Sequence, residues 1–341
     1  MTLPDEQVAL SRRGLLRGAT LGGAAVAAAT LLPTGLASAS GYGGGDVRQV
    51  PGVTTVIDTS HAEHDVSVLF SDYFRTKSAK NPEGLMAFFD RRSTNYIDAI
   101  LGWPFYSWQE LHDLFATYMP QWPANGTSSP VRILGDSSSA VVFFTNTKDL
   151  FGPSEMRAAG VVNFNRQGKI TRWVDYWDGR HFGTDNLNKS RLAADQFPKD
   201  FKESLSGETA ARGIRAVSNS LNAALRNGDG AAAAGLFAGD AVFEDMPAHV
   251  QILGPRSIGA YLTSAAGVLP YTGNGLAVRH VVGSGQGGGY EWTATGRPVP
   301  RGLNALELDA QSKITRLTAV WDGTLVDDQA LVTLGQKAIE R

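Results

Sequence analysis

The 341-residue sequence contains no cysteine, and its charges are few and nearly balanced. Without cysteine, the chain cannot form disulfide bonds, thiolate nucleophiles or cysteine-ligated zinc sites. The formal net charge is -2 and no basic run occurs, so we expect no nucleic-acid partner. The six histidines show no metal-ligand spacing. We therefore expect no metal and no other cofactor.

A long apolar stretch lies at the N-terminus. The twin-arginine pattern Ser11–Leu16 opens it, glycines and Pro33 interrupt it, and Ala37-Ser38-Ala39 ends it. This order predicts a twin-arginine signal peptide over 1–39 and argues against a membrane anchor. The mature protein is then expected to be periplasmic or extracellular, without stable membrane insertion. Residues 40–59 are expected to form a flexible N-terminal segment.

An internal repeat organises the rest of the chain. Lys169–Gly179 returns as Lys313–Gly323, with seven of eleven residues identical. Each copy is rich in β-branched and aromatic residues and ends in Asp-Gly, which predicts a strand followed by a turn. Because the spacing is domain-sized, the repeat predicts two copies of one fold.

Side chains alternate between the two faces of a strand, so every second residue of the repeated strand shares a face. Trp173, Asp175 and Trp177 share one face of the first copy. A carboxylate between two indoles needs a partner or a shifted pKa if it is buried. The second copy keeps Trp321 but has Ala319 in the position of Asp175. The two copies therefore share structure and differ in chemistry.

Both copies show the same order of elements: helices, one early strand, a further helix, then a meander of strands. The expected helices of the first copy are 66–76, 83–89 and 108–119, and its strands are 93–98, 131–134, 140–147, 156–165 and 170–177. The expected helices of the second copy are 210–227, 231–237 and 255–265, and its strands are 241–245, 277–282, 289–295, 303–308 and 314–321. This pattern predicts an α+β fold, with three helices on a curved, mostly antiparallel sheet in each copy.

Domain boundaries follow from the repeat. The first domain is expected over 60–182 and the second over 210–325, with a linker over 183–209 and a C-terminal helix or tail over 326–341. The two sheets are expected to pair within one chain, which predicts a monomer or weak oligomer.

The second copy resembles the ketosteroid isomerase and SnoaL-like polyketide-cyclase superfamily, which has a cone-shaped, nuclear-transport-factor-like fold. The resemblance is carried by Asn227–Asp229, Phe237–Pro247, Gly254–Ile258 and Lys313–Trp321. It implies that Asp245 occupies the position of the general base and Asn304 that of the oxyanion-hole acid. Leu221 stands where those isomerases have their oxyanion tyrosine.

The first copy resembles limonene epoxide hydrolase through Lys169–Asp178. The resemblance implies that Asp175 is a catalytic carboxylate, and that Tyr96 and Asp98 hold the attacking water. Asp98 also matches the isomerase base, and Tyr73 the isomerase oxyanion tyrosine. The hydrolase's central-strand arginine and second aspartate fall near Phe143 and Thr145, so that triad is incomplete.

Each candidate catalytic residue also has a structural interpretation. Asp175 can act as a general acid or base, or accept a local amide. Asp98 shares a face with Tyr96 and can couple to Asp175, or it can simply begin a loop. Tyr73 can donate to an oxyanion or belong to the core, and Asp245 can pair with a nearby histidine or be structural. The expected substrate-binding residues are Trp173, Trp177, Phe243, Trp321 and Asn304.

The sequence thus favours a cofactor-free general acid–base enzyme of cyclase, epoxide hydrolase or isomerase type. Its expected substrate is a bulky hydrophobic molecule such as a polyketide or terpenoid, and the resemblance implies a place in antibiotic or other secondary metabolism. The alternative is an exported, non-catalytic binding protein for a hydrophobic small molecule. Proximity of Asp98 and Asp175 in one cavity is the feature that separates the two hypotheses.

Overall fold

A computed structural model describes residues 56–198, 200–201 and 207–339. The expected signal peptide and most of the segment 40–59 lie outside these residues. Among the described residues, no helix is both long and apolar enough to cross a bilayer.

The first unit contains three helices against a seven-stranded sheet. Its helices are α2 (His64–Ser78), α3 (Pro82–Met86) and α4 (Trp108–Tyr118), followed by a 3-10 turn (Met119–Gln121). Its strands are β1 (Asp58–Ala62), β2 (Asn95–Asp98), β3 (Trp103–Phe105), β4 (Ser128–Gly135), β5 (Ser139–Asn146), β6 (Met156–Phe164) and β7 (Ile170–Trp177). A 3-10 turn (Gly179–Phe182) and α5 (Thr184–Ser190) lead out of the unit.

The second unit repeats this plan with a six-stranded sheet. Its helices are α6 (Arg212–Arg226), α7 (Gly230–Ala234) and α8 (Pro255–Ala265), and α9 (Asp328–Lys337) follows a 3-10 turn (Gly323–Leu325). Its strands are β8 (Phe237–Asp245), β9 (Val250–Leu253), β10 (Leu276–Gly283), β11 (Gly287–Ala294), β12 (Arg301–Leu308) and β13 (Ile314–Val320).

Strand order makes the duplication visible. The first sheet runs β1-β4-β5-β6-β7-β2-β3 and the second runs β10-β11-β12-β13-β8-β9. In each, the repeated strand (β7 or β13) lies parallel to the early strand (β2 or β8), and the meander is antiparallel. The predicted α+β class with two tandem units is therefore confirmed.

Helix ends follow local sequence chemistry. Ser107 caps α4 by accepting from the Glu110 amide, and the Glu110 carboxylate accepts in return from the Ser107 amide. This reciprocal capping box satisfies amides that the first helical turn leaves without partners. The capping box therefore sets the start of α4 at Trp108.

Three short strands were not predicted: β1, β3 and β9. Each pairs with one neighbour only at an edge or end of its sheet. Three to five residues give too little alternation to be distinguished from a loop, and the centre of β3 is a proline. The helix expected over 83–89 is also shorter, because α3 ends at Met86 and the chain then turns toward β2.

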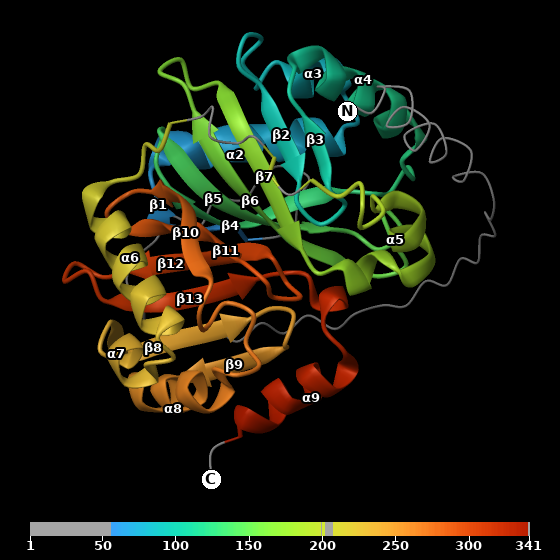
Figure 1. Ribbon diagram of the computed structural model, residues 1–341. Coiled ribbons are helices and arrows are strands. Elements are labelled where there is room, and N and C mark those ends of the chain that lie inside the picture. The colour runs from blue at the N-terminus through green and yellow to red at the C-terminus, as the bar shows by residue number, and fades with distance from the viewer. Residues whose placement is uncertain (1–55, 199, 202–206, 340–341) are drawn as a thin grey trace, which may run out of the picture.

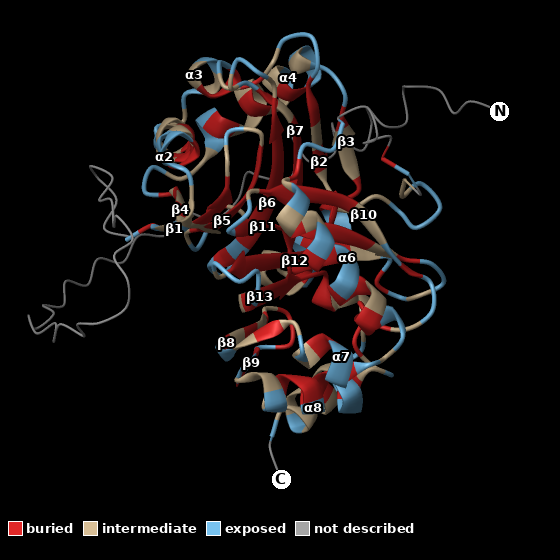
Figure 2. Cartoon of the chain, turned by 90° about the vertical axis from the view of Figure 1, so that its left-hand side faces the viewer, coloured by how far each residue is buried: buried red, intermediate tan, exposed pale blue. Residues whose placement is uncertain are grey.

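The two sheets pack against each other through a shared apolar layer. Figure 1 shows the sheet β1–β7 above the sheet β8–β13, with α3 and α4 at one end and α7 and α8 at the other. Val161 and Val174 of the first sheet meet Leu303 and Val320 of the second in this layer. Buried residues run through both sheets in Figure 2, and exposed residues gather on outer helices and loops. Each sheet thus has one face toward its own helices and one toward the other unit.

A buried ion pair crosses the layer. Arg172 of β7 donates to the Glu291 carboxylate of β11, and neither side chain is exposed. Tyr176 also donates to Glu291, at 2.6 Å. The charged pair fixes the two sheets laterally, because apolar contacts alone are not directional.

Candidate active site

The site lies where β2 and β7 run side by side. The register pairs Tyr96 with Trp173 and Asp98 with Asp175. Since side chains alternate along a strand, all four point to the same face of the sheet, the face that the helices cover. The expected grouping of Asp98, Tyr96 and Asp175 in one place is what the structure shows.

Tyr96, Asp98 and Asp175 line a cavity of about 150 Å³. Besides the indoles, seven lining residues have polar side chains: Lys77, Tyr96, Asp98, Tyr118, Asn146, Asp175 and Ser190. The rest of the wall is apolar or aromatic. A mostly apolar cavity with a few convergent polar groups is the usual form of a small-molecule site. An apolar cavity of this size holds a ligand about as large as benzene. The volume therefore favours a compact ligand over a bulky one.

Asp175 is buried at the inner end of the cavity. Its Oδ2 accepts from the Tyr96 hydroxyl, and its Oδ1 accepts from Trp173 Nε1 at 2.6 Å. Burial raises the pKa of Asp175, while the Lys77 charge and the two hydrogen bonds oppose that rise. Burial also raises the pKa of Tyr96 well above its usual value, so the phenol stays protonated and holds the carboxylate in place.

Asp98 lies partly exposed in the same cavity. Its Oδ1 accepts from the amides of Ile100 and Leu101, at 3.0 and 2.8 Å, and its Oδ2 accepts from Trp177 Nε1 at 3.2 Å. Burial and then the Asp175 charge raise the pKa of Asp98 to about 7, against these hydrogen bonds. The carboxyl group therefore exchanges a proton near neutral pH. It also begins the loop after β2, as its structural interpretation expected.

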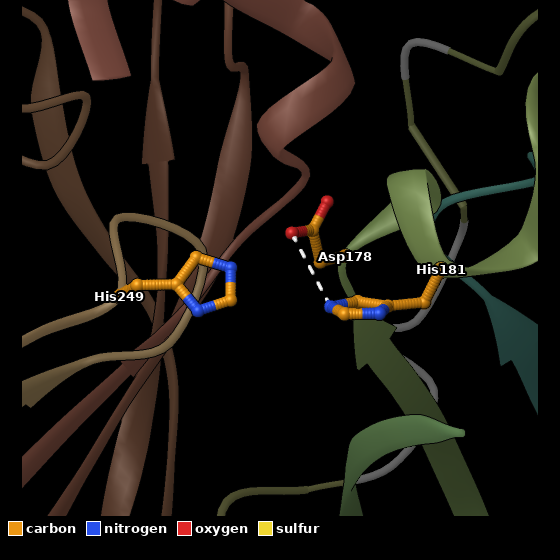
Figure 3. Close-up of side chains that lie close together, drawn as sticks. All are labelled: Asp178, His181 and His249. Atoms are coloured by element: carbon orange, nitrogen blue, oxygen red, sulfur yellow. Dashed lines mark ion pairs between the residues drawn. The ribbon is translucent and has the colours of Figure 1, made fainter. Parts of the chain in front are cut away.

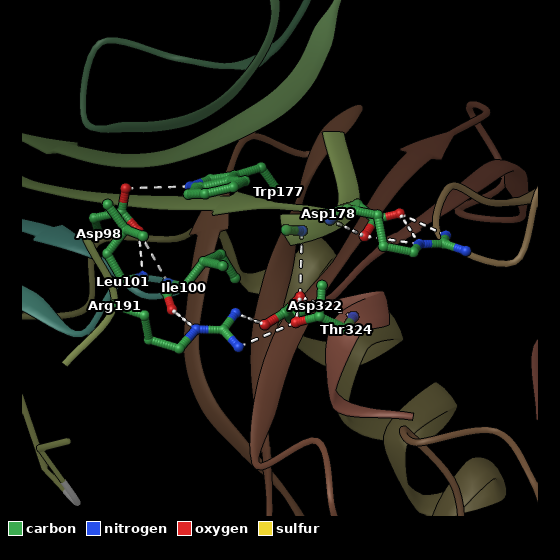
Figure 4. Close-up of polar contacts among 10 residues, drawn as sticks. Asp98, Ile100, Leu101, Trp177, Asp178, Arg191, Asp322 and Thr324 are labelled. Carbon is green, nitrogen blue, oxygen red and sulfur yellow. Dashed lines mark hydrogen bonds and ion pairs between the residues drawn. The ribbon is translucent and has the colours of Figure 1, made fainter. Parts of the chain in front are cut away.

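The loop behind Asp98 is braced by the second unit. Arg191 donates to the Ile100 carbonyl at 3.0 Å and to the Asp322 carboxylate, and its other nitrogen reaches Thr324 (Figure 4). Asp322 also accepts from the Gly179 amide at 3.2 Å. The duplicated unit thus holds in place the two amides that bond Asp98.

Lys77 is a member of the site that sequence reasoning missed. Its side chain enters the cavity from the last turn of α2 and places Nζ 4.8 Å from the centre of the Phe144 ring. Burial lowers the pKa of Lys77 to about 8, although the Asp175 charge opposes this. The signal was present: Val66, Phe70, Phe74 and Lys77 fall along one helical stripe, which turns a lysine toward the core.

Tyr73 lies behind the cavity wall. It is buried, stacks on Trp173 with ring centres 4.8 Å apart, and packs against Phe74, Phe88 and Phe89. It is absent from the residues that line the cavity. Trp173 is also absent from the cavity lining and donates its N–H to Asp175. Trp177 does line the cavity. The catalytic and binding roles of these residues stay predictions.

Gly160 of β6 is what lets Trp173 reach Asp175. A Cβ at Gly160 would lie 2.8 Å from the Trp173 indole, closer than carbon atoms approach. The indole therefore occupies the space that any side chain at 160 would take, which fixes its N–H against the carboxylate.

In the second unit, Asp245 and Trp321 are the counterparts of Asp98 and Trp177, and both are completely buried. Asp245 accepts from Tyr271 at 2.6 Å, from Trp321 Nε1 at 3.0 Å and from the Ala248 amide at 3.0 Å. Burial raises the pKa of Asp245 to about 6, against these three hydrogen bonds. Sequence reasoning missed Tyr271, which comes from the segment before β10 and gives no periodic signal.

The other predicted residues of the second unit are core residues by position. Phe243, Trp321 and Asn304 are fully buried, and the Asn304 amide donates to the Tyr290 hydroxyl at 2.9 Å. The sequence left open a pairing of Asp245 with His249, but Asp245 accepts from Tyr271, Trp321 and Ala248 instead.

His249 instead joins a group with metal-ligand chemistry. Its ring lies with His181 and Asp178 so that one ligand atom of each falls within 4.8 Å of the others (Figure 3). The carboxylate is already paired with Arg180, whose Nε and Nη2 donate to Asp178 Oδ2 at 2.9 and 2.5 Å. A cation would have to displace that guanidinium, so this group fits a metal poorly.

The chain was compared with protein families, curated proteins and solved structures. No family profile and no curated protein matches the chain. Among solved structures, a steroid delta-isomerase from Pseudomonas aeruginosa has 17% identity and a TM-score of 0.30, and covers 39% of this chain and 93% of its own. A putative polyketide cyclase from Sinorhizobium meliloti has 15% identity and a TM-score of 0.28, over 33% and 95%.

A SnoaL-like protein of unknown function from Burkholderia thailandensis has 10% identity and a TM-score of 0.30, over 34% of this chain and 98% of its own. Each match spans about a third of this chain, the extent of one unit.

Proposed function

We propose that this chain is a cofactor-free acid–base enzyme whose substrate is a compact, mostly apolar small molecule bound in the first unit. One observation carries the proposal: Asp98 and Asp175, in register on adjacent strands, line the same apolar cavity. Carboxylates with perturbed pKa values in a cavity are typical of acid–base sites.

The two carboxylates take different roles. Asp175 holds its charge through the donors Tyr96 and Trp173. That charge helps to raise the pKa of Asp98 to about 7, so near neutral pH Asp98 is present in both forms. A group of this kind accepts a proton from one substrate atom and returns it to another. Epoxide opening, ring closure, dehydration and double-bond isomerisation all need this transfer.

The cavity sets the size of the substrate. Its volume of about 150 Å³ fits one or two small rings. Among the polyketides and terpenoids expected from the sequence, this volume supports the smaller molecules as substrates. Trp177 and Phe144 form apolar walls that exclude water from the carboxylates.

Activity of the Asp175→Asn variant tests the proposal. The full chain is incubated with a panel of one- and two-ring epoxides and enones, and products are measured by chromatography with mass detection. Wild type should turn over at least one of them, and Asp175→Asn should lower kcat/KM about 10²- to 10³-fold, because the charge that poises Asp98 is lost. Asp195→Asn, a change at an exposed turn, should match wild type.

Equal turnover by wild type and Asp175→Asn would show that the first unit is not an acid–base site.

The second candidate function is a non-catalytic binding protein. The observation in its favour is that every oxygen of Asp98 and Asp175 already accepts a hydrogen bond. Saturable quenching of tryptophan fluorescence without turnover of any panel member would favour it.

Export is part of the same proposal. The twin-arginine pattern and the Ala37-Ser38-Ala39 site support release of a protein that begins at Ser40. Intact-mass measurement of the protein recovered outside the cytoplasm should give the chain 40–341, and replacing Arg12 and Arg13 with lysine should keep the full chain inside. A full-length chain outside the cytoplasm would contradict a cleaved signal.

A further inference from the structure

Lys77 is placed where a lysine is energetically costly. Its side chain is 7% exposed and lies against the rings of Phe144 and Phe74, with Nζ 4.8 and 5.5 Å from their centres. Burial of an ammonium group costs several kcal/mol unless a carboxylate or hydrogen-bond acceptors compensate. A contact with an aromatic face returns only about 1–2 kcal/mol of this cost.

An ion pair does not explain why a lysine is buried at this position. Within the described part of the chain, Nζ of Lys77 has no ion pair within 4.0 Å and no hydrogen-bond partner, and both oxygens of the nearby Asp175 are bonded to Tyr96 and Trp173. Other lysines differ: Nζ of Lys80 donates to the Ala124 carbonyl at 2.9 Å. The amine of Lys77 thus points, without a protein partner, into a cavity that also holds two carboxylates.

We propose that Lys77 is an amine nucleophile that forms an imine with the carbonyl carbon of an aldehyde or ketone bound in this cavity. This inference rests on the proposed function and deepens it, because it names the substrate class as a compact apolar carbonyl compound. The geometry that carries it is the unpartnered Nζ, the aromatic wall and the adjacent Asp98 and Asp175, all on one cavity.

The chemical step balances without any further reagent. The neutral amine attacks the carbonyl carbon to give a carbinolamine, and the former carbonyl oxygen leaves as water. The net change joins a protonated amine and a carbonyl to give one protonated imine and one water. Asp98 carries the proton that the amine loses and the departing oxygen gains, and the Asp175 charge stabilises the cationic imine.

Formation of the imine links Lys77 to the acid–base pair. A protonated imine draws electrons from the neighbouring carbon and makes its hydrogen more acidic than in the parent carbonyl. Asp98 then removes that hydrogen and returns it elsewhere, which is the transfer already assigned to this group. Water entering the cavity hydrolyses the imine and restores the free amine.

Reductive trapping tests the proposal on the full chain. Wild type is incubated at pH 7.5 with benzaldehyde, whose ring matches the cavity, and sodium cyanoborohydride, which reduces imines to stable amines. Fragment mass spectrometry then locates the benzyl groups. With its pKa lowered to about 8, Lys77 is neutral in about a quarter of molecules at this pH, against about one in a thousand for an ordinary lysine.

We expect Lys77 to be labelled at least tenfold faster than Lys80, with a rate that levels off above about pH 8. Lys77→Met should lose only that label, and Lys80→Met, a matched change three residues away, should keep it. A competing apolar ligand such as benzene should slow labelling of Lys77 but not of surface lysines. Because the mapping is made on wild type, it does not depend on a variant folding.

Equal labelling of Lys77 and Lys80, or none at Lys77, would overturn the imine. The two proposals fail separately. If Lys77 is not labelled while Asp175→Asn still loses turnover, the imine falls and the acid–base enzyme stands. If Lys77 is labelled selectively while Asp175→Asn turns over as wild type does, the imine stands and the role given to Asp175 falls.

Discussion

Replacing Glu291 with glutamine should lower the free energy of unfolding by about 3–5 kcal/mol. Glu291 and Arg172 are both fully buried between the sheets, so the change removes the carboxylate that pairs with a buried guanidinium. Glutamine keeps the shape of the side chain, removes the charge and replaces one acceptor oxygen by an amide donor. The loss should appear in urea unfolding, followed by far-ultraviolet circular dichroism and by tryptophan fluorescence.

An exposed pair across the same interface provides the control. Arg157 of β6 contacts Glu244 of β8 at 3.2 Å, and its side chain is 56% exposed. Arg157→Gln should change the free energy of unfolding by no more than about 1 kcal/mol, because water screens the pair. If Glu291→Gln costs as little as Arg157→Gln, the buried pair does not hold the sheets together. Restored stability in an Arg172→Met/Glu291→Met double variant would identify the unpaired charge as the cause.

The architecture was predictable from the sequence because its signals are long or repeated. The returning stretch at Lys313 indicated two units, and the Asp-Gly pair marked the end of each repeated strand. What could not be predicted were short elements such as β3 and β9, since their pairing depends on the neighbouring strand and not on their own pattern.

The candidate site was predictable only in part. Strand alternation was enough to expect Asp98, Tyr96 and Asp175 together, because a two-residue period fixes the face of each side chain. Alternation says nothing of where a proton lies, so the hydrogen bond from Tyr96 to Asp175 could not be foreseen. Lys77 was missed because lysine is usually exposed, although its position on the apolar stripe of α2 indicated otherwise.

The two copies of the repeated strand differ at four positions, and one of these differences removes a carboxylate. Ala319 replaces Asp175, and without that second carboxylate Asp245 sits in a closed core, bonded by Tyr271 and Trp321. The second unit nonetheless serves the first: its Asp322 and Thr324 hold Arg191, which holds the loop beside Asp98. The duplicated unit thus supports the loop that borders the cavity of the first unit.

Asp98→Asn should have opposite effects on activity and stability. Activity on the substrate identified for wild type should fall about 10²- to 10⁴-fold, because asparagine cannot carry the proton. Stability at pH 8 should rise relative to wild type, by on the order of 2 kcal/mol, because wild type there holds an ionised carboxylate beside Asp175. Thermal unfolding between pH 4 and 8 measures the second effect.

The pH dependence has a definite sign. The pKa of Asp98 is about 7 in the folded protein, above the value near 3.9 of an unfolded chain, so the folded state binds the proton more tightly. The stability from this group is complete below about pH 4 and is lost as the pH rises to 7. Asparagine does not titrate, so the gap between variant and wild type should widen over that range and stay flat above it.

Control variants and contrary outcomes decide how these measurements are interpreted. Asp195→Asn, at an exposed turn, should change neither activity nor the stability profile. If Asp98→Asn loses activity and stability together at every pH, the carboxylate is a structural acceptor for the loop amides of Ile100 and Leu101 and not a proton carrier. If Asp245→Asn abolishes turnover and Asp98→Asn does not, catalysis belongs to the second unit. A proton-transfer role for Asp98 requires two results together: Asp98→Asn must lose activity, and its stability must no longer depend on pH between about 4 and 7. A purely structural carboxylate gains nothing from a pKa raised to about 7.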